Sequence, residues 1–356
     1  MPSTRTPLAV GMVGLNVRGN GWAAEGHAPA VQAVDGLVLA GVATTRPETA
    51  AEAAARFGVA RSYGDPLAMI DDPAIDVVAV VSPVPTHREL VLAALDRGKP
   101  VLTEWPVAAG GEAMAEIAAI EARAAVPHAV NLQARRSPAA VRLADLVADG
   151  ALGRTLSVRV LSTTAGFGSS IVPAYVPLEE PATWTSLGTI QTAHTLDLVT
   201  HVFGALGDAH ALLDVQHPVV EVEGREPVVR HLPDHVLVHG RLAGGGTLDL
   251  EVQGGRAPDD APFRLEVVGE RASAALLGGA PRGFQAGTLR LLLDGAPVDL
   301  PPSALDALPA SVVNVAHTYA ALRDDIEAGT RTAPSFGDAA DLAASLASLG
   351  LGLVEG

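Results

Sequence analysis

The first third of the chain alternates short apolar runs with longer segments in which apolar residues recur every three or four positions. A short apolar run between turn residues is typical of a buried strand, and the longer spacing is typical of a helix. The predicted strands are 8–15, 37–43, 75–81, 101–102 and 126–132, and the predicted helices are 22–34, 47–57, 87–97 and 112–123. Buried strands that alternate with helices form parallel sheets with helices on both faces. We therefore expect residues 1–130 to fold as a doubly wound α/β domain.

The pattern changes after residue 130. Apolar and polar residues then alternate with a period of two, which is typical of antiparallel strands with one buried face. The predicted strands are 157–161, 236–242, 247–252 and 264–268, and the predicted helices are 142–149, 190–203, 314–328 and 338–349. We expect residues 131–356 to form an α+β domain, with a mostly antiparallel sheet and helices on one of its faces.

Composition narrows the possible partners. The chain has 24 Lys and Arg against 40 Asp and Glu, a net charge of −16, whereas nucleic acids and anionic membranes both need a basic surface. It has no cysteine, which excludes thiol nucleophiles, disulfides and thiolate metal sites. The sequence contains no apolar run of about 18 residues, and residues 1–7 lack the features of a signal peptide. We expect a cytoplasmic protein with neither a nucleic-acid nor a membrane partner.

Lys99 is the one lysine of the sequence, so chemistry that depends on an amine has a single candidate. It precedes the predicted strand 101–102, whereas ligands of doubly wound sheets bind beyond the carboxyl ends of the strands. Lys99 is therefore expected to lie away from the site.

A glycine-containing turn follows the first predicted strand. Gly14, Leu15 and Asn16 lie where the dinucleotide-binding loop of a Rossmann domain lies, and Gly19 follows them. Asn16 takes the place of the second glycine, and asparagine tolerates left-handed backbone conformations better than most residues. Arg18 is a candidate for a charge-assisted bond to phosphate. The alternative is a tight strand-to-helix turn that binds nothing.

The end of the second predicted strand bears on the choice of cofactor. Sites specific for NAD place an acidic residue there to bind the ribose hydroxyls. This chain has Thr45 and Arg46 instead, with no acid before Glu48. A hydroxyl and a guanidinium suit a 2′-phosphate, so we expect NADP, with NAD as the other possibility. Alternatively, Arg46 is a solvated residue at the start of a helix.

Several motifs together resemble the Gfo/Idh/MocA oxidoreductases. They are VSPVPTH at 81–87, AALDRGKPVLTEWP at 93–106, NLQARRSP at 131–138, GALG at 150–153 and HTLD at 194–197. Within the family, the sequence looks most like the branch of the fungal galactose-regulon repressor, through GLN at 14–16, GW at 21–22, HAP at 27–29 and PDH at 233–235. The resemblance implies an N-terminal Rossmann dinucleotide-binding domain and a C-terminal domain for substrate binding and oligomerisation.

The resemblance also implies cofactor contacts after the fourth and fifth strands. Ser82, Pro83 and Val84 are expected beside the nicotinamide half of the cofactor. His87 begins the next helix and is expected either to cap it or to touch the ribose. Glu104 and Trp105 are expected at the end of the fifth strand. This list completes the cofactor residues predicted above.

Trp105 departs from the family pattern. Most members have a lysine at this position, which resembles a general acid and base beside the nicotinamide. An indole N–H donates a hydrogen bond but does not exchange a proton at working pH. We expect Trp105 to stack on the substrate or on the nicotinamide ring.

His194 is then the predicted proton-exchanging residue. His194 and Asp197 are three residues apart, so on a helix they share a face, with His201 further along. The resemblance implies a His and an Asp near the substrate at these two positions, and Asp197 is expected to orient His194. Against this, Ile190 and Thr192 stand where the family has an acid and a glycine. The alternatives are a core histidine satisfied by Asp197 and, less favoured, a metal site.

Three further residues are candidates for the substrate pocket. Tyr175 and Trp184 lie in a long segment rich in Gly, Pro and aromatic residues, and such segments often cover sites. Tyr175 is either an acid or a packing residue. Arg135 is expected either to hold a substrate hydroxyl or carboxylate or to pair with an acid.

The sequence thus favours an oxidoreductase that uses NADP and acts on a polyhydroxylated small molecule such as a sugar or cyclitol, in a homo-oligomer. A dinucleotide-binding regulator that acts through a protein partner remains open, as does a net non-redox reaction. No metal site is expected.

Overall fold

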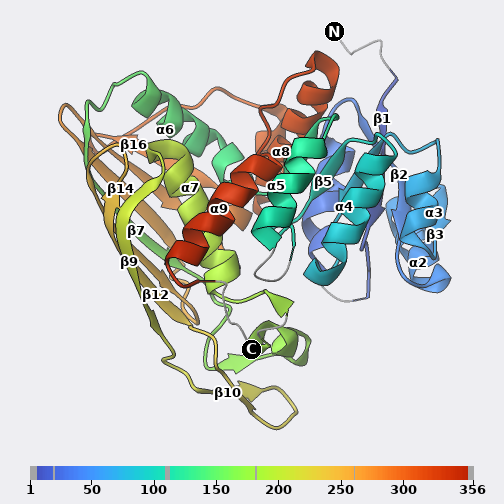
Figure 1. Ribbon diagram of the computed structural model, residues 1–356, viewed down its shortest axis with the longest axis horizontal. Helices are drawn as coiled ribbons and strands as arrows, with labels where there is room; N and C mark the ends of the chain where they lie inside the picture. The colour runs from blue at the N-terminus through green and yellow to red at the C-terminus, as the bar shows by residue number, and fades with distance from the viewer. Residues whose placement is uncertain (1–5, 19–20, 109–112, 181–182, 260, 352–356) are drawn as a thin grey trace. The chain divides into compact units, whose positions relative to one another are not determined.

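The structure is a computed structural model that describes residues 6–18, 21–108, 113–180, 183–259 and 261–351 (Figure 1). Contacts divide the chain into two units. Unit 1 consists of Met1–Asn131 and Ala304–Ala340, and unit 2 consists of Leu132–Ser303 and Asp341–Gly356. Sequence reasoning placed residues 304–340 in the second domain, so the structure differs at this point. Among the described residues, no helix is long and apolar enough to cross a membrane.

Unit 1 contains a six-stranded parallel sheet in the order β3-β2-β1-β4-β5-β6, the order of dinucleotide-binding doubly wound folds. The strands are β1 (Leu8–Val13), β2 (Leu37–Ala43), β3 (Arg61–Tyr63), β4 (Val77–Val80), β5 (Val101–Thr103) and β6 (His128–Val130). The helical elements are η1 (Ala23–His27), α1 (Ala28–Ala33), α2 (Pro47–Phe57), α3 (Pro66–Asp71), η2 (Val84–Thr86), α4 (His87–Asp96), α5 (Ala113–Arg123), η8 (Ala304–Ala307) and α8 (Ala310–Ala328). The predicted parallel sheet is confirmed.

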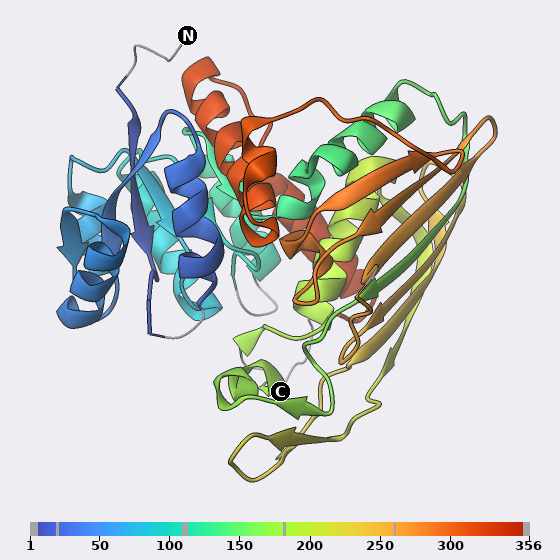
Figure 2. The same ribbon diagram turned by 180° about the vertical axis from the view of Figure 1, so that it is seen from behind.

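Helix α8 belongs to unit 1 although it comes from the last fifth of the chain. Figure 2 shows it beside α1, and the two helices share one hydrophobic core. Val312, Val315 and Tyr319 of α8 are buried there with Ala28 and Val31 of α1. Hydrophobic periodicity predicted the helix but not the sheet that it covers, because an apolar face on a helix carries no information about the surface that it packs against.

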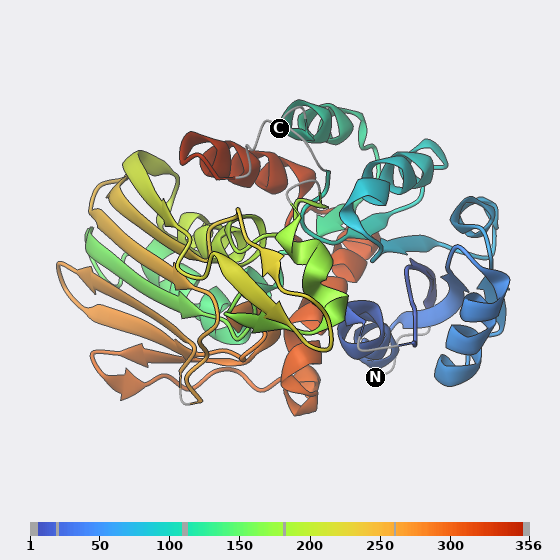
Figure 3. The same ribbon diagram turned by 90° about the horizontal axis from the view of Figure 1, so that it is seen from below.

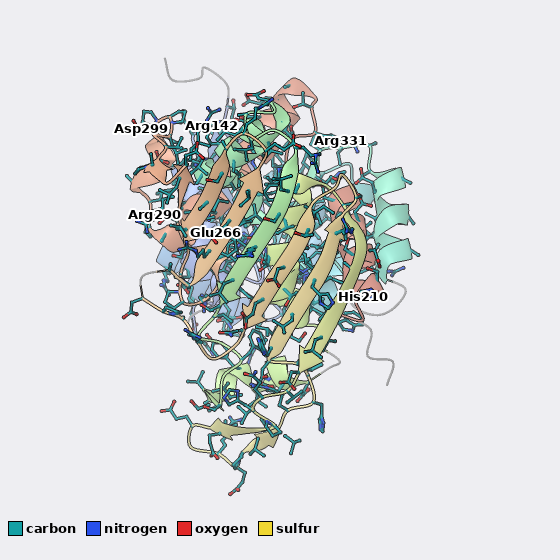
Figure 4. All side chains as sticks on the ribbon, turned by 90° about the vertical axis from the view of Figure 1, so that its left-hand side faces the viewer. Arg142, His210, Glu266, Arg290, Asp299 and Arg331 are labelled. Carbon is teal, nitrogen blue, oxygen red and sulfur yellow. The ribbon has the colours of Figure 1, made fainter. Side chains whose placement is uncertain are left out.

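Unit 2 is built on an eight-stranded sheet in the order β17-β16-β15-β14-β7-β13-β12-β9, in which only β7 and β13 run parallel. The strands are β7 (Thr155–Thr163), β9 (Leu206–Asp214), β12 (His235–Leu242), β13 (Thr247–Gln253), β14 (Phe263–Gly269), β15 (Ser273–Gly278), β16 (Leu289–Leu293) and β17 (Ala296–Pro297). Helices α6 (Pro138–Ala148) and α7 (Ala193–Phe203) lie against one face of the sheet (Figure 1). The other face carries polar side chains such as His210 and Glu266 (Figure 4). The predicted mostly antiparallel sheet is confirmed.

A smaller sheet, β11-β10-β8, lies at one end of unit 2 and is nearest the viewer in Figure 3. Its strands are β8 (Ser170–Ile171), β10 (Val219–Val222) and β11 (Val228–Val229), with the helical segment η4 (Pro173–Glu179) alongside. Arg230 holds this region together by binding Glu179, Asp234 and the carbonyl oxygens of Phe167 and Gly168. The remaining helical elements are η3 (Gln133–Arg136), η6 (Gly188–Thr192), η7 (Phe284–Ala286) and α9 (Phe336–Ser348), the last of which has residues in both units.

Candidate functional site

The loop after β1 is packed tightly against the end of β4. Gly14 has φ +89°, and a Cβ built on it would lie 2.1 Å from the carbonyl oxygen of Val81. Leu15 is buried, whereas Asn16 is exposed and its Oδ1 accepts a bond from the backbone N–H of Arg18 at 2.9 Å. Because Gly14 has no side chain, the loop after β1 can approach the end of β4 closely at the carboxyl edge of the sheet. Dinucleotides bind at this edge in doubly wound folds, so the loop fits a dinucleotide cofactor. Gly19 lies outside the described residues.

Arg18 forms an ion pair with Glu52 of α2. Its Nε lies 2.7 Å from Oε2 and its Nη2 2.5 Å from Oε1, a bidentate arrangement on the surface. This pairing raises the pKa of Arg18 and lowers that of Glu52. A bond from Arg18 to a phosphate would require the pair to open, and exposed pairs contribute little to stability.

The turn after β2 is held by its backbone and leaves two side chains in solvent. Thr44 Oγ1 donates to the carbonyl of Arg46 at 2.8 Å and contacts Thr49 Oγ1 at 2.6 Å. The side chains of Thr45 and Arg46 are exposed. Both are thus accessible where the sequence predicts a 2′-phosphate.

His87 braces the loops that follow β4 and β5. Its ring is buried, with Nδ1 2.7 Å from the carbonyl oxygen of Pro106 and Nε2 2.6 Å from that of Ser82. Both ring nitrogens are therefore bound by backbone carbonyl groups, and a contact of His87 with the cofactor stays a prediction. Ser82 is partly exposed, Pro83 is exposed and Val84 is buried.

Trp105 and Lys99 lie at opposite ends of β5. Lys99 precedes the strand and donates to the carbonyl oxygen of Asp72 at 2.6 Å, and burial lowers its pKa. Trp105 follows the strand, with 6% of its surface exposed, and its peptide bond to Pro106 is cis. Lys99 is therefore remote from the carboxyl ends of the strands, as predicted. The small exposed area of Trp105 leaves little ring surface for the predicted stacking.

Glu104 is bonded to a cluster of buried polar side chains. His27 Nε2 is 2.7 Å from Glu104 Oε1, and His27 Nδ1 is 2.9 Å from the hydroxyl of Tyr319. Asn131 donates through Nδ2 to the same glutamate oxygen at 2.5 Å. Sequence reasoning predicted Glu104 but assigned no role to the other three residues, which come from η1, α8 and the end of β6.

Unit 2 contains the predicted residues of α7. His194 and Asp197 are both buried, and Arg135 of η3 binds Asp197 through Nε to Oδ2 at 3.0 Å and through Nη2 to Oδ1. Asp197 is thus the counter-ion of a buried arginine. For Arg135 the structure supports the alternative in which it pairs with an acid.

His27 is the last residue of one π-helical turn, and His194 comes shortly after another. The π-helical turn η1 ends at His27, and the π-helical turn η6 ends at Thr192, two residues before His194. Single π turns occur frequently at functional sites. His201 is exposed, and no group of three or more metal-ligating side chains occurs in the part of the chain that the structure describes.

Tyr175 and Trp184 come from the segment that precedes η6. Tyr175 is exposed on η4, and its hydroxyl accepts a bond from Arg282 at 3.4 Å. Trp184 has φ +57°, a left-handed conformation that is rare for a large side chain, and it lines a cavity of about 280 Å³ with Leu232 and Leu351. Among the described residues that line this cavity, neither His194 nor Arg135 occurs.

Comparison with known families agrees with this architecture. The model of the Gfo/Idh/MocA oxidoreductase family, NAD-binding Rossmann fold, matches residues 8–132. The model of the Gal80p C-terminal domain matches residues 138–278. Together the two matches cover most of both units.

Individual relatives include both enzymes and a regulator. Levoglucosan dehydrogenase of Pseudarthrobacter phenanthrenivorans is 33% identical over 187 residues, which are 50% of this chain and 45% of that protein. The match thus spans about half the length of this curated relative. The solved structure of a super-repressor mutant of Gal80p from Saccharomyces cerevisiae has a TM-score of 0.84 at 21% identity, covering 97% of this chain and 96% of that one.

A second solved structure is a levoglucosan dehydrogenase in complex with NADH and L-sorbose. It has a TM-score of 0.77 at 23% identity and covers 97% of this chain and 98% of its own. At such identities the likeness to both structures concerns the fold. The two family matches, to residues 8–132 and 138–278, show that the chain belongs to the Gfo/Idh/MocA oxidoreductase family, in the branch that carries a Gal80p-like C-terminal domain.

Proposed function

We propose that this protein is an oxidoreductase that uses a nicotinamide dinucleotide and acts on a sugar, a cyclitol or a related polyhydroxylated compound. The observation that carries the proposal is the close contact of Gly14 with the end of β4, which builds a dinucleotide cradle at the carboxyl edge of the sheet. The names of the relatives support it, since one is a levoglucosan dehydrogenase and one neighbour was solved with NADH and L-sorbose. When bound, the dinucleotide supplies hydride exchange.

We further propose NADP as the preferred cofactor. Thr45 and Arg46 are exposed at the end of β2, and no carboxylate stands at the position that selects NAD. The guanidinium of Arg46 would bind the 2′-phosphate. Arg18 would join it once its pair with Glu52 opens.

Unit 2 contains the residues that the sequence predicts for substrate binding. His194 and the ion pair of Arg135 with Asp197 form a buried polar region on α7 and η3. The prediction that His194 exchanges a proton stays a prediction, and so do the pocket roles of Tyr175 and Trp184.

A second candidate function is a dinucleotide-binding regulator without catalysis. It is favoured by Trp105, which replaces the family's lysine, and by the Gal80p-like C-terminal domain. Such a protein would bind reduced cofactor tightly and leave it unconsumed.

A cofactor and substrate screen tests the proposal. The purified protein is mixed with NADP⁺ or NAD⁺ and a panel of sugars and cyclitols, and formation of reduced nicotinamide is followed by absorbance. We expect turnover with a higher kcat/KM for NADP⁺, and a roughly tenfold loss of NADPH affinity in Arg46→Ala with NADH affinity unchanged, the effect of one charge-assisted bond. Tight binding of cofactor without turnover of any panel member would support the regulator.

A homo-oligomer in the cytoplasm completes the proposal. The open face of the large sheet carries His210 and Glu266 (Figure 4). Leu212 on β9 and Val268 on β14 are exposed and lie two residues from these, so by the alternation of a strand they share this face, on which a second copy would pack. Light scattering of the purified protein measures its oligomeric state.

A further inference from the structure

A chain of hydrogen bonds in unit 1 ends at the carboxylate of Glu104. It starts at Tyr319 on α8, passes through His27 at the end of η1, and reaches Glu104 Oε1 over contacts of 2.9 and 2.7 Å. Asn131 donates to the same oxygen at 2.5 Å. Two buried donors, His27 and Asn131, thus bind the same carboxylate oxygen of Glu104, and His27 is itself hydrogen-bonded to Tyr319.

The donor and acceptor roles in this series of hydrogen bonds follow from Tyr319. Burial raises the pKa of its phenol well above the usual value, and the charge of Glu104 raises it further, so the group keeps its proton. Its bonding partner in the described part of the chain is His27 Nδ1, and a buried hydroxyl without an acceptor is costly. Tyr319 therefore donates to Nδ1, and His27 donates from Nε2 to Glu104. Glu104 is the acceptor at the end of this series of hydrogen bonds.

Exposure singles out Glu104 as the member that a ligand can reach. The side chain of Glu104 is 18% exposed, whereas His27 and Asn131 are 0% exposed and Tyr319 is 1% exposed. Glu104 directly follows β5, at the edge of the sheet where ligands bind. It is also the one ionisable residue between Val101 and Ala108, because Trp105 stands where the family has its lysine.

We propose that Glu104 exchanges the proton of the reacting substrate hydroxyl, and that His27 and Tyr319 are its positioning residues; the proposal rests on the oxidoreductase function proposed above. In the direction of oxidation, the O–H bond of the substrate breaks and its proton goes to the carboxylate of Glu104. The C–H bond on the same carbon breaks with its electron pair, which leaves as hydride to the oxidised nicotinamide dinucleotide, and a carbonyl forms. In reduction, protonated Glu104 returns the proton to the oxygen.

The two buried partners keep Glu104 ready for this role. Two donors on Oε1 hold the carboxylate in one orientation, so the acid is placed before the substrate arrives. Because the hydroxyl of Tyr319 donates to Nδ1 of His27, the imidazole uses Nε2 to donate to Glu104 and does not compete with it as an acceptor. This proposal and the prediction for His194 exclude one another.

Substitution of Glu104 combined with chemical rescue tests the proposal in the full-length protein. Glu104→Gln is expected to lower kcat roughly 100-fold or more, as for loss of a general base, and to lower the affinity for NADPH, measured by nicotinamide fluorescence, far less than kcat. Sodium formate is expected to restore turnover to Glu104→Ala in a saturable manner, because a small carboxylate can enter a partly exposed position. Tyr319→Phe should lower kcat less and move the acidic limb of the pH profile to higher pH.

The exposed acid Glu89 on α4 provides the matched control. Glu89→Gln should leave kcat, NADPH binding and the pH profile as in the unaltered protein. If the unaltered protein turns over no substrate, the proposed function and this inference both fail. If it turns over substrate and Glu104→Gln keeps its kcat, or if formate fails to rescue Glu104→Ala, this inference alone fails.

Discussion

At the scale of single residues, Gly14 meets two requirements at the same position. Its φ of +89° lies in a region that side chains disfavour, and any Cβ would collide with the carbonyl of Val81. The first requirement concerns only the local backbone, whereas the second concerns the distance between the loops after β1 and β4. Both loops belong to the proposed cofactor site, so the collision should affect binding as well as stability.

Gly14→Ala is therefore expected to abolish measurable NADPH binding and to destabilise the protein by several kcal/mol, through strain and overpacking together. Gly224 is the matched control, because it has φ +66° but a Cβ added to it would meet nothing within 4 Å. Gly224→Ala should cost only about 1 kcal/mol and leave NADPH binding intact. Nicotinamide fluorescence and urea unfolding measure the two effects, and equal losses in both variants would contradict the explanation.

The residues of the candidate site were predictable to different degrees. Gly14, Thr45 and Arg46 follow strands that apolar runs reveal, so their place at the edge of the sheet could be inferred from local pattern. His27 and Tyr319 are 292 residues apart, and no periodicity relates segments at such separation. The pairing of Arg135 with Asp197 could be named only as one alternative, because an arginine and an acid do not reveal their partners in sequence.

At the scale of elements, local signals located most helices and strands. β2 and α2 have the predicted bounds, since a seven-residue apolar run precedes a helix with Pro at its start and Gly58 at its end. β3 and α3 were missed, because a strand of three residues and a helix of six are too short to show a period. The π-helical turns η1 and η6 were predicted as parts of ordinary helices, because a single wide turn barely changes the apolar spacing.

The end of α8 depends on one buried carboxylate. Asp325 accepts bonds from the backbone N–H groups of Thr332 and Ala333, each at 2.8 Å, and from the hydroxyl of Thr330 at 2.7 Å. The turn so held brings the carbonyl of Pro334 to the N–H of Val130 at the end of β6, at 2.7 Å. Asp325 thereby connects a late helix to an edge strand of the parallel sheet.

Asp325→Asn should destabilise the protein by about 2 kcal/mol near neutral pH, because its amide cannot replace the charged acceptor. Burial alone would raise the pKa of Asp325, but the hydrogen bonds from Ala333, Thr330 and Thr332 outweigh it and the pKa is lowered. The difference between the two proteins should therefore be complete above the unfolded pKa of about 3.9 and should vanish as pH falls through the folded value.

Urea unfolding over a series of acidic pH values measures this difference. The neighbouring exposed acid Asp324 serves as control, and Asp324→Asn should change stability by no more than about 0.5 kcal/mol. A loss in Asp325→Asn that stays constant down to low pH would argue against the carboxylate as its source.

At the scale of the whole molecule, unit 1 is formed by two segments that are far apart in the sequence. Residues 1–131 supply the parallel sheet and its first helices, and residues 304–340 supply α8 and the segment that bonds to β6. The hydrophobic core between α1 and α8 contains apolar residues from both segments. Unit 1 is therefore expected to be incomplete without the later segment.

A fragment of residues 1–131 should thus lack cooperative thermal unfolding, because the apolar side of α1 is left uncovered. The same fragment joined to residues 304–340 by a flexible Gly/Ser linker should unfold cooperatively. Circular dichroism and calorimetry distinguish the two. Cooperative unfolding of the shorter fragment at the midpoint of the longer one would show that α8 is dispensable.

The position of Tyr319 on α8 also sets an order of events during synthesis. When residues 1–131 leave the ribosome, the strands of the parallel sheet are all present, yet His27 still lacks the hydroxyl to which its Nδ1 binds. About 190 further residues must be translated before that phenol exists, at a rate that takes the ribosome on the order of ten seconds or more. A nascent chain therefore contains every residue of its nucleotide loop long before α8 exists, but the core that stabilises this loop and the acid cluster of Glu104 are both completed only when α8 packs on α1. Cofactor binding and the proposed proton-exchanging group are thus expected to arise together, late in synthesis.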